Sequence, residues 1–183
     1  MASEQMQKVA TEVQTVLTDQ LQNGTSATLN NHTVTNMQLI KSHSWSGNFN
    51  TQPPKTITSH GGVARFVHLK GVKGSKAGVM YTITGAVVIP EAPYAVVLAW
   101  DAPSNFSPMS PNRLYGKCGP KSVIEKLPWE AIEKELEKAG PSVVINDEVA
   151  KISVHANLTN NPKTKMADLW ANFLVIPPTP NNP

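Results

Sequence analysis

A glycine-rich stretch with two lysines, preceded by a third, has residue types and spacing that could bind an anion. Residues 71–78 read GVKGSKAG and contain Lys73 and Lys76, with Lys70 just before them. Ammonium groups beside flexible backbone amides could hold a headgroup phosphate. The stretch is not a Walker loop, because that pattern needs four residues between its first Gly and a Gly-Lys-Ser/Thr end, which this stretch lacks, and no helix is expected to follow. It predicts a hairpin turn, with Lys73 and Lys76 as candidate ligand-binding residues.

A second group of candidates follows the most apolar part of the chain. Asp101-Ala102-Pro103 ends that part, and a proline-rich loop then runs from Ser104 to Pro120, with a short strand expected at 113–117. Long ordered loops commonly carry binding groups. Asp101 could be a general base, although an acid at this position more often accepts hydrogen bonds from loop amides. Asp101, Arg113 and Tyr115 complete the candidate ligand-binding residues.

No catalytic or metal-binding pattern is visible in the sequence. The histidines show no metal-ligand spacing; they are His32, His43, His60, His68 and His155. The nucleophile-elbow pattern is absent, and Ser59-His60-Gly61-Gly62, which is similar to the oxyanion loop of some esterases, has no nucleophile beside it. We therefore expect a protein that is not an enzyme and needs no metal or cofactor.

Cys118 is the single cysteine, so no intrachain disulfide can form. This suits a reducing compartment or a protein indifferent to redox state, and we expect a cytoplasmic location. The adjacent Lys117 could lower the pKa of the thiol, although a lone cysteine is more often a spectator. The start of the chain lacks the pattern of a signal peptide, and no apolar run reaches the roughly 18 residues of a spanning helix.

The chain has 183 residues and a net charge of +3. This length predicts one domain, residues 1–176, followed by a flexible proline-rich tail, residues 177–183. The lysines are dispersed and aromatic residues are few, so nucleic acid is not an expected partner. The excess of positive charge would suit peripheral contact with an anionic membrane.

The stretch Ala77–Pro103 must position these candidates, because it predicts two long strands joined by a turn at Pro90 and Pro93. In the second strand, Tyr94 to Trp100, both faces are apolar. A strand that is dry on both sides lies inside a sheet with another layer over each face. The rest of the chain should cover this strand.

Two amphipathic helices and several short strands are expected around it. Apolar residues at three- and four-residue steps predict a helix from Ser3 to Gln22, docked on the sheet rather than detachable, because its polar face carries only Lys8 as a basic residue. A second helix begins after Pro128 and ends at Gly140-Pro141. The remaining strands are expected within 27–45, 63–70, 149–158 and 169–176. The predicted fold is α+β, a mainly antiparallel β-sandwich flanked by two amphipathic helices.

Several motifs together carry a resemblance to a known family. They include Lys41-Ser42-His43-Ser44-Trp45-Ser46-Gly47, Ala64-Arg65-Phe66-Val67-His68, Gly74-Ser75-Lys76-Ala77-Gly78 and Leu98-Ala99-Trp100-Asp101. In this order, over roughly residues 30–118, they resemble the plant 23 kDa jasmonate-induced proteins. The resemblance implies a stress or defence association. The order of elements is also similar to that of the actinoporin and aegerolysin cytolysins, in which a proline-containing aromatic loop binds lipid headgroups.

The sequence thus predicts a soluble stress or defence protein that binds a carbohydrate or a lipid headgroup without catalysis. The alternative is a membrane-permeabilising cytolysin, and a third possibility is a structural, partner-binding domain. The loop Ala102–Tyr115 argues against pore formation, since it contains Phe106 and Tyr115 but no cluster of tyrosine and tryptophan that could anchor at a membrane.

Overall fold

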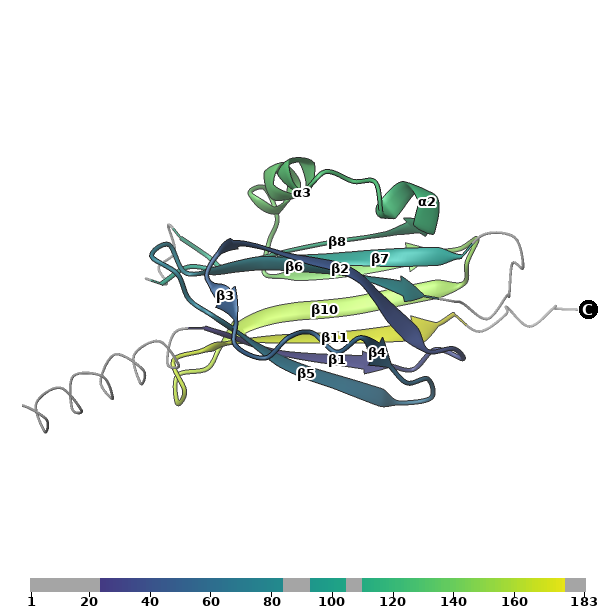
Figure 1. Ribbon diagram of the computed structural model, residues 1–183, viewed down its shortest axis with the longest axis horizontal. Coiled ribbons are helices and arrows are strands. Elements are labelled where there is room, and N and C mark those ends of the chain that lie inside the picture. Colours follow the sequence, from purple (N-terminus) through teal and green to yellow (C-terminus); the bar gives the residue numbers. More distant parts are fainter. Residues whose placement is uncertain (1–23, 84–92, 105–109, 177–183) are drawn as a thin grey trace, which may run out of the picture.

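The computed structural model describes residues 24–83, 93–104 and 110–176, which form two β-sheets packed face to face (Figure 1). The six-stranded sheet has the order β3-β5-β1-β11-β10-β9, and the five-stranded sheet has the order β4-β2-β6-β7-β8. All strand pairs are antiparallel except β1 and β11, which run parallel. The predicted β-sandwich is confirmed.

The strands of the six-stranded sheet are β1 (Thr25–Asn31), β3 (Asn48–Phe49), β5 (Gly62–Leu69), β9 (Ser142–Asp147), β10 (Ile152–Asn160) and β11 (Ala167–Val175). Those of the five-stranded sheet are β2 (Met37–Ser46), β4 (Thr56–Ile57), β6 (Ser75–Ile83), β7 (Tyr94–Ala102) and β8 (Arg113–Pro120). The helices are α2 (Lys121–Ile124) and α3 (Trp129–Leu136).

Strand β7 is the central element that its sequence predicts. It lies between β6 and β8, and its residues 95–100 are all buried. Val96, Leu98 and Trp100 face the other sheet, while Val97 and Ala99 face the helices. Successive side chains of a strand point to opposite faces, so a strand that is apolar throughout needs a layer on each side.

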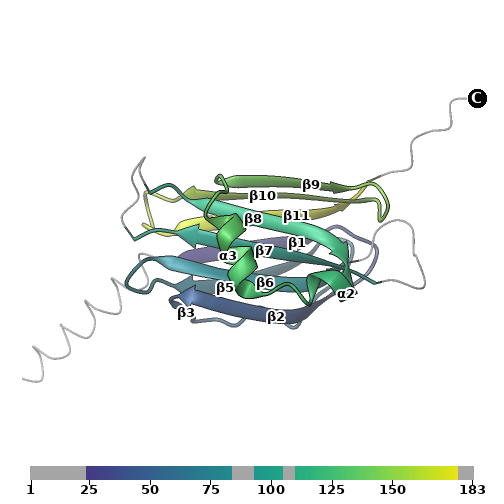
Figure 2. The same cartoon turned by 90° about the horizontal axis from the view of Figure 1, so that it is seen from above.

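Helices α2 and α3 supply the layer outside the five-stranded sheet (Figures 1 and 2). In α3, Ile132 and Leu136 are fully buried, as the apolar stripe that begins at Trp129 predicts. Pro128 precedes the first turn, as expected from its fixed φ. The other predicted helix, Ser3–Gln22, lies outside the described residues, as do the tail 177–183 and the turn residue Pro90.

Four strands differ from the sequence-based expectation: the two-residue strands β3 and β4 lie outside the predicted ranges, and β8 and β9 differ as follows. Strand β8 is a full strand of 8 residues, although the sequence predicted only a short strand inside a loop. Strand β9 was not predicted, since its apolar run, Val143–Ile145, is only three residues long; it lies at the sheet edge with every second residue exposed. Lys76, expected in a flexible turn, lies within β6, because the turn is confined to Gly71–Gly74 and the ladder to β7 begins at Ser75.

A polar network centred on His68 links the two sheets inside the core. The fully buried His68 ring contacts Ser75 Oγ through Nδ1 and Ser44 Oγ through Nε2, at 2.9 Å each. Ser75 Oγ also lies 2.7 Å from Thr25 Oγ1 and accepts a hydrogen bond from Trp100 Nε1 at 3.3 Å. Every polar side chain in this network has a partner, which is what burial requires. Burial lowers the pKa of His68 to about 4, so the ring is neutral at pH 7.

Among the described residues, neither helix has the length and hydrophobicity needed to span a membrane. The domain boundaries 1–176 and 177–183 remain predictions.

Candidate functional site

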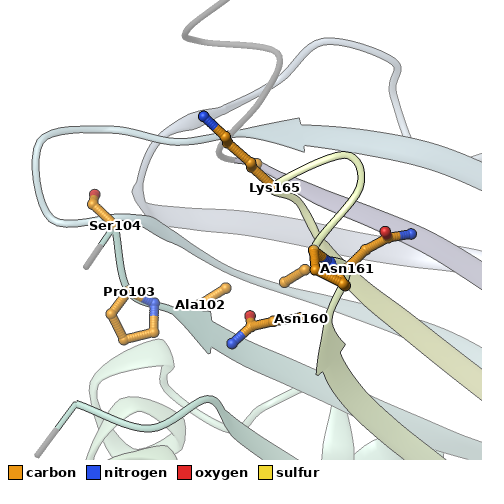
Figure 3. Close-up of a pocket in the computed structure, with 9 residues that line it drawn as sticks. Ala102, Pro103, Ser104, Asn160, Asn161 and Lys165 are labelled. Atoms are coloured by element: carbon orange, nitrogen blue, oxygen red, sulfur yellow. The ribbon is translucent and has the colours of Figure 1, made fainter. Parts of the chain in front are cut away.

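A pocket of about 210 Å³ lies at one end of the sandwich, where three separate parts of the chain meet. One wall is the end of β7 and the residues after it, Ala102–Ser104. The opposite wall is the turn between β10 and β11, with Asn160, Asn161 and Lys165 (Figure 3). Gly24, just before β1, also lines it. The parallel pairing of β1 with β11 brings Gly24 to this place, since Ala167 N donates to Gly24 O at 2.9 Å.

Asn160 offers hydrogen-bond donors to the pocket. Its side-chain oxygen Oδ1 accepts a hydrogen bond from Asn112 Nδ2 at 3.0 Å, and Asn112 is itself buried. This contact orients the amide, so that the nitrogen of Asn160 points toward Pro103 across the pocket (Figure 3). The fixed orientation leaves its NH₂ group available to a bound acceptor.

Ser104 and Lys165 add two further polar groups. Ser104 Oγ is buried and, within the described residues, has no hydrogen-bond partner. A buried hydroxyl without a partner costs free energy, unless a ligand or water satisfies it. Lys165 sits in a left-handed conformation with φ of 57° and makes no ion pair in the described part of the chain. The residues that line the pocket include a lysine and no carboxylate.

Asn161 holds the turn rather than facing the pocket. Its amide points away from Pro103 (Figure 3), and its Nδ2 donates to Asp168 Oδ2 at 2.9 Å. Its Oδ1 accepts from the backbone N–H of Lys163 at 3.0 Å, as in an Asx turn. The backbone N–H of Lys165 in turn donates to Asn161 O at 2.8 Å, so the position of Lys165 depends on this turn.

The glycine-rich hairpin supports the wall formed by Ala102–Ser104 through Gly74. Gly74 has φ of 114°, and a Cβ there would lie 2.4 Å from Ala102 O and 2.9 Å from Ser104 N. The backbone of the wall therefore packs directly on a position that only glycine fits. The two loops that the sequence proposed as ligand-binding, 71–78 and 102–115, are neighbours here.

We expect Gly74→Ala to lower the free energy of unfolding by about 2 kcal/mol, because it adds a steric clash to an unfavourable φ. Gly61→Ala is the matched control, since Gly61 has φ of 98° but open space around a Cβ. It should cost about 1 kcal/mol from the dihedral alone. Urea titration of both variants measures the difference. Equal losses would mean that Ala102–Ser104 does not rest on Gly74.

Three of the predicted site residues form ion pairs on the helix-covered face, away from the pocket lining. Lys76, Asp101 and Arg113 are register neighbours on β6, β7 and β8. Arg113 lies 3.6 Å from Asp101, and Lys76 Nζ lies 2.6 Å from Glu133 of α3. Burial raises the pKa of Asp101, an effect that Lys76 and Arg113 only partly offset. These charges tie α3 and the sheet together. The helical spacing of α3, with Ile132 and Leu136 inside, predicts that Glu133 faces water, but Glu133 is half-buried in this contact.

Tyr115, Lys73 and Cys118 lie in three different environments. Tyr115 is half-buried on the helix-covered face, and burial raises the pKa of its hydroxyl. Lys73 is exposed in the hairpin turn, and Phe106 lies outside the described residues. Burial raises the pKa of the Cys118 thiol to about 12. The suggestion that Lys117 lowers this pKa is therefore wrong, because desolvation of the thiolate dominates.

Aromatic rings fasten α3 to β2 beside these ion pairs. Trp129 stacks on His43 with ring centroids 5.1 Å apart and meets Trp45 edge-on at 5.6 Å. Lys41 Nζ lies 5.4 Å from the Trp129 ring and donates to Glu125 O at 2.7 Å. A Cβ at Gly78 would lie 2.9 Å from Trp129, so a glycine makes room for the ring. These contacts explain the cluster as a packing interface.

The described residues hold no group of three or more His, Cys, Asp or Glu side chains that could bind a metal ion. Ser75 and His68, which are in contact, are of the residue types that serve as nucleophile and general base in hydrolases. Both side chains are fully buried, however, and no carboxylate is among the hydrogen-bond partners of the ring. The pair is a structural element of the core.

Sequence analysis missed Ser104, Asn160 and Lys165 as site residues. The polar run after β10, NNPKTK, marked a turn and offered two lysines. This turn lies opposite Ala102–Ser104 because of the order of the strands, which cannot be predicted from a local sequence pattern. Among the predicted residues, none lines the pocket.

Comparison with known proteins places the chain near one family. The family model described as "Nakanori-like protein" matches residues 1–159. A jasmonate-induced protein homolog from Atriplex canescens is 30% identical over 143 residues, which cover 77% of this chain and 75% of the relative. The crystal structure of the lipid-binding protein Nakanori matches with a TM-score of 0.65 at 14% identity, covering 94% of this chain and 80% of the other. The resemblance to jasmonate-induced proteins is thereby confirmed, and the structural match supports the β-sandwich.

Proposed function

The chain belongs to the Nakanori-like protein family, and from this premise we propose that it is a non-catalytic, stress-associated protein that binds a lipid headgroup in the pocket between Ala102–Ser104 and Asn160–Lys165. The solved relative is named a lipid-binding protein, and the curated relative is named a jasmonate-induced protein homolog. In this proposal the protein acts in the cytoplasm.

The observation that carries the proposal is the polarity of the pocket. Its lining includes Asn160, whose amide nitrogen is not used in the contact with Asn112, the buried Ser104, which has no hydrogen-bond partner within the described residues, and Lys165, with no carboxylate among the lining residues. Donors and a positive charge without a negative one favour a phosphate over an amine or a metal. The phosphate of a phospholipid headgroup fits this chemistry. The loop end of the sandwich also allows the pocket to face a bilayer surface without inserting a strand.

The test is co-sedimentation of the purified protein with phosphatidylcholine vesicles and with vesicles that also contain phosphatidylserine. We expect binding, and we expect Lys165→Ala and Asn160→Ala each to weaken it by about tenfold, because one charge-assisted or buried hydrogen bond is lost. Lys163→Ala is the matched control, as it removes the same charge from the same turn but outside the pocket lining. It should retain most of the affinity.

Equal losses in Lys163→Ala and Lys165→Ala would mean unspecific attraction to the membrane and would contradict the pocket. Dye release from the same vesicles distinguishes the cytolysin alternative, which requires permeabilisation. We expect none. Release that depends on residues 3–22, which lie outside the described residues, would favour that alternative.

A further inference from the structure

The outer face of the six-stranded sheet is a second candidate binding surface, because it carries an exposed tryptophan among polar side chains. Helices α2 and α3 cover the other sheet, and no described helix or strand packs on this face (Figure 1). Its central residue is Trp170 of β11, with 51% of its surface exposed. Within the described residues, the Trp170 ring makes no ring–ring or cation–π contact. About half of this large ring is therefore left open to a ligand in the described structure.

Hydrogen-bonding side chains surround this ring on the same face. Register places Thr28 of β1 on one side of Trp170 and Asn157 of β10 on the other. Neighbouring strands lie about 5 Å apart, and residues two apart along one strand about 7 Å. Asp168 and Asn172 lie two residues before and two residues after Trp170 on β11, and so about 7 Å from it. The ring is thus framed by a hydroxyl, amides and a carboxylate.

Several of these groups are held in place by their own contacts. Asn30 Nδ2 donates to Asn172 Oδ1 at 3.0 Å, and Asn161 Nδ2 donates to Asp168 Oδ2 at 2.9 Å. His155, the register neighbour of Asn172, contacts Ser153 Oγ through Nε2 at 2.9 Å. Each contact fixes one atom of the side chain and leaves the other amide nitrogen, carboxylate oxygen or ring nitrogen to a ligand. Fixed side chains lose less entropy on binding.

The charge of this face fits a neutral, hydroxyl-rich partner. Arg65 of β5, two strands from Trp170, and Asp168 carry opposite charges, in contrast to the pocket with its unopposed lysine. The core of a protein–protein interface is mostly apolar, but the side chains nearest to the Trp170 ring are polar, which favours a smaller, polar ligand over a protein partner. A sugar presents C–H groups on the faces of its ring and hydroxyls at its edge, which match an aromatic plane inside a frame of donors and acceptors.

We propose that this face is a binding site for a neutral oligosaccharide, with Trp170 stacked on one sugar ring and Asn157, Asp168 and Asn172 bonded to its hydroxyls. The site lies apart from the proposed lipid pocket, although Asp168 also bonds to Asn161 in the turn of that pocket. It makes the protein able to engage a glycan and a lipid on different surfaces.

The test titrates the full chain separately with cellohexaose, xylohexaose, mannohexaose and chitohexaose. Calorimetry and tryptophan fluorescence measure the binding. At least one should bind and change the fluorescence. Trp170→Ala should weaken binding by at least about tenfold and Asn157→Ala by several-fold, while Trp170→Phe, which keeps a stacking ring, should retain part of it. Because Trp170 is half exposed, its variants should unfold at nearly the urea concentration of the unchanged chain.

Lys165→Ala should leave oligosaccharide binding unchanged, which separates this site from the proposed lipid pocket. Binding of none of the four probes at millimolar concentration would overturn the proposal, as would equal binding by Trp170→Ala. Sedimentation of the unchanged chain as a dimer that Trp170→Ala converts to a monomer, without oligosaccharide binding, would instead identify the face as a contact between copies.

Discussion

Leu98→Ala is expected to lower the free energy of unfolding by about 2–5 kcal/mol, the usual cost of a buried leucine that leaves a cavity. Leu98 is 1% exposed and lies at the centre of β7, facing the other sheet. Its register neighbour on β8 is Gly116, which has no side chain to move into the space. Val143 and Ile145, which pack over Gly116 beside Leu98, can fill the space only by shifting, so we expect a loss within this range.

Urea titration measures this change, and Val144→Ala is the control, since Val144 is 62% exposed on β9 and should change stability by no more than about 0.5 kcal/mol. A loss below about 1 kcal/mol for Leu98→Ala would contradict the central position of β7.

Mild acid is expected to destabilise the protein through His68, by up to about 3 kcal/mol. The pKa of histidine is about 6.5 in an unfolded chain, and burial lowers it to about 4 in the fold. Between these pH values the unfolded state binds more protons, so stability rises with pH. The contribution is fully present above about pH 6.5 and is lost as the pH falls to about 4, at about 1.4 kcal/mol per pKa unit.

Urea titrations at several pH values from 7 to 4 provide the measurement, and His68→Gln isolates the effect because glutamine bonds to serine but does not titrate. The difference between the two proteins is the relevant quantity, since Asp101 has a raised pKa and therefore acts in the opposite direction as pH falls. Parallel losses of stability in both proteins would show that His68 does not cause the acid sensitivity.

The sequence by itself determined the elements whose patterns are local. Alternation of apolar residues on both faces predicted β7, because the two-residue period of a strand is a property of consecutive residues. Pro128 and Gly140-Pro141 bounded α3 in the same way, and its buried stripe followed from helical spacing. The quoted motifs also predicted the relationship to jasmonate-induced proteins, which the matched relative confirms.

Only the tertiary structure decided which residues become neighbours. Strand β9 escaped prediction because its apolar run, Val143–Ile145, is only three residues long, and the pairing of Lys76 with Glu133 could not be predicted because it depends on where α3 lies. The pocket joins Ala102–Ser104 to Asn160–Lys165, segments more than fifty residues apart in sequence. Alternation along β11 could place Trp170 on the face opposite to the buried Leu169 and Ala171. Whether Trp170 is exposed depends on which of the two sheets the helices cover. Contacts of this kind follow from the order of strands and layers, which long-range packing determines and no short window of sequence contains.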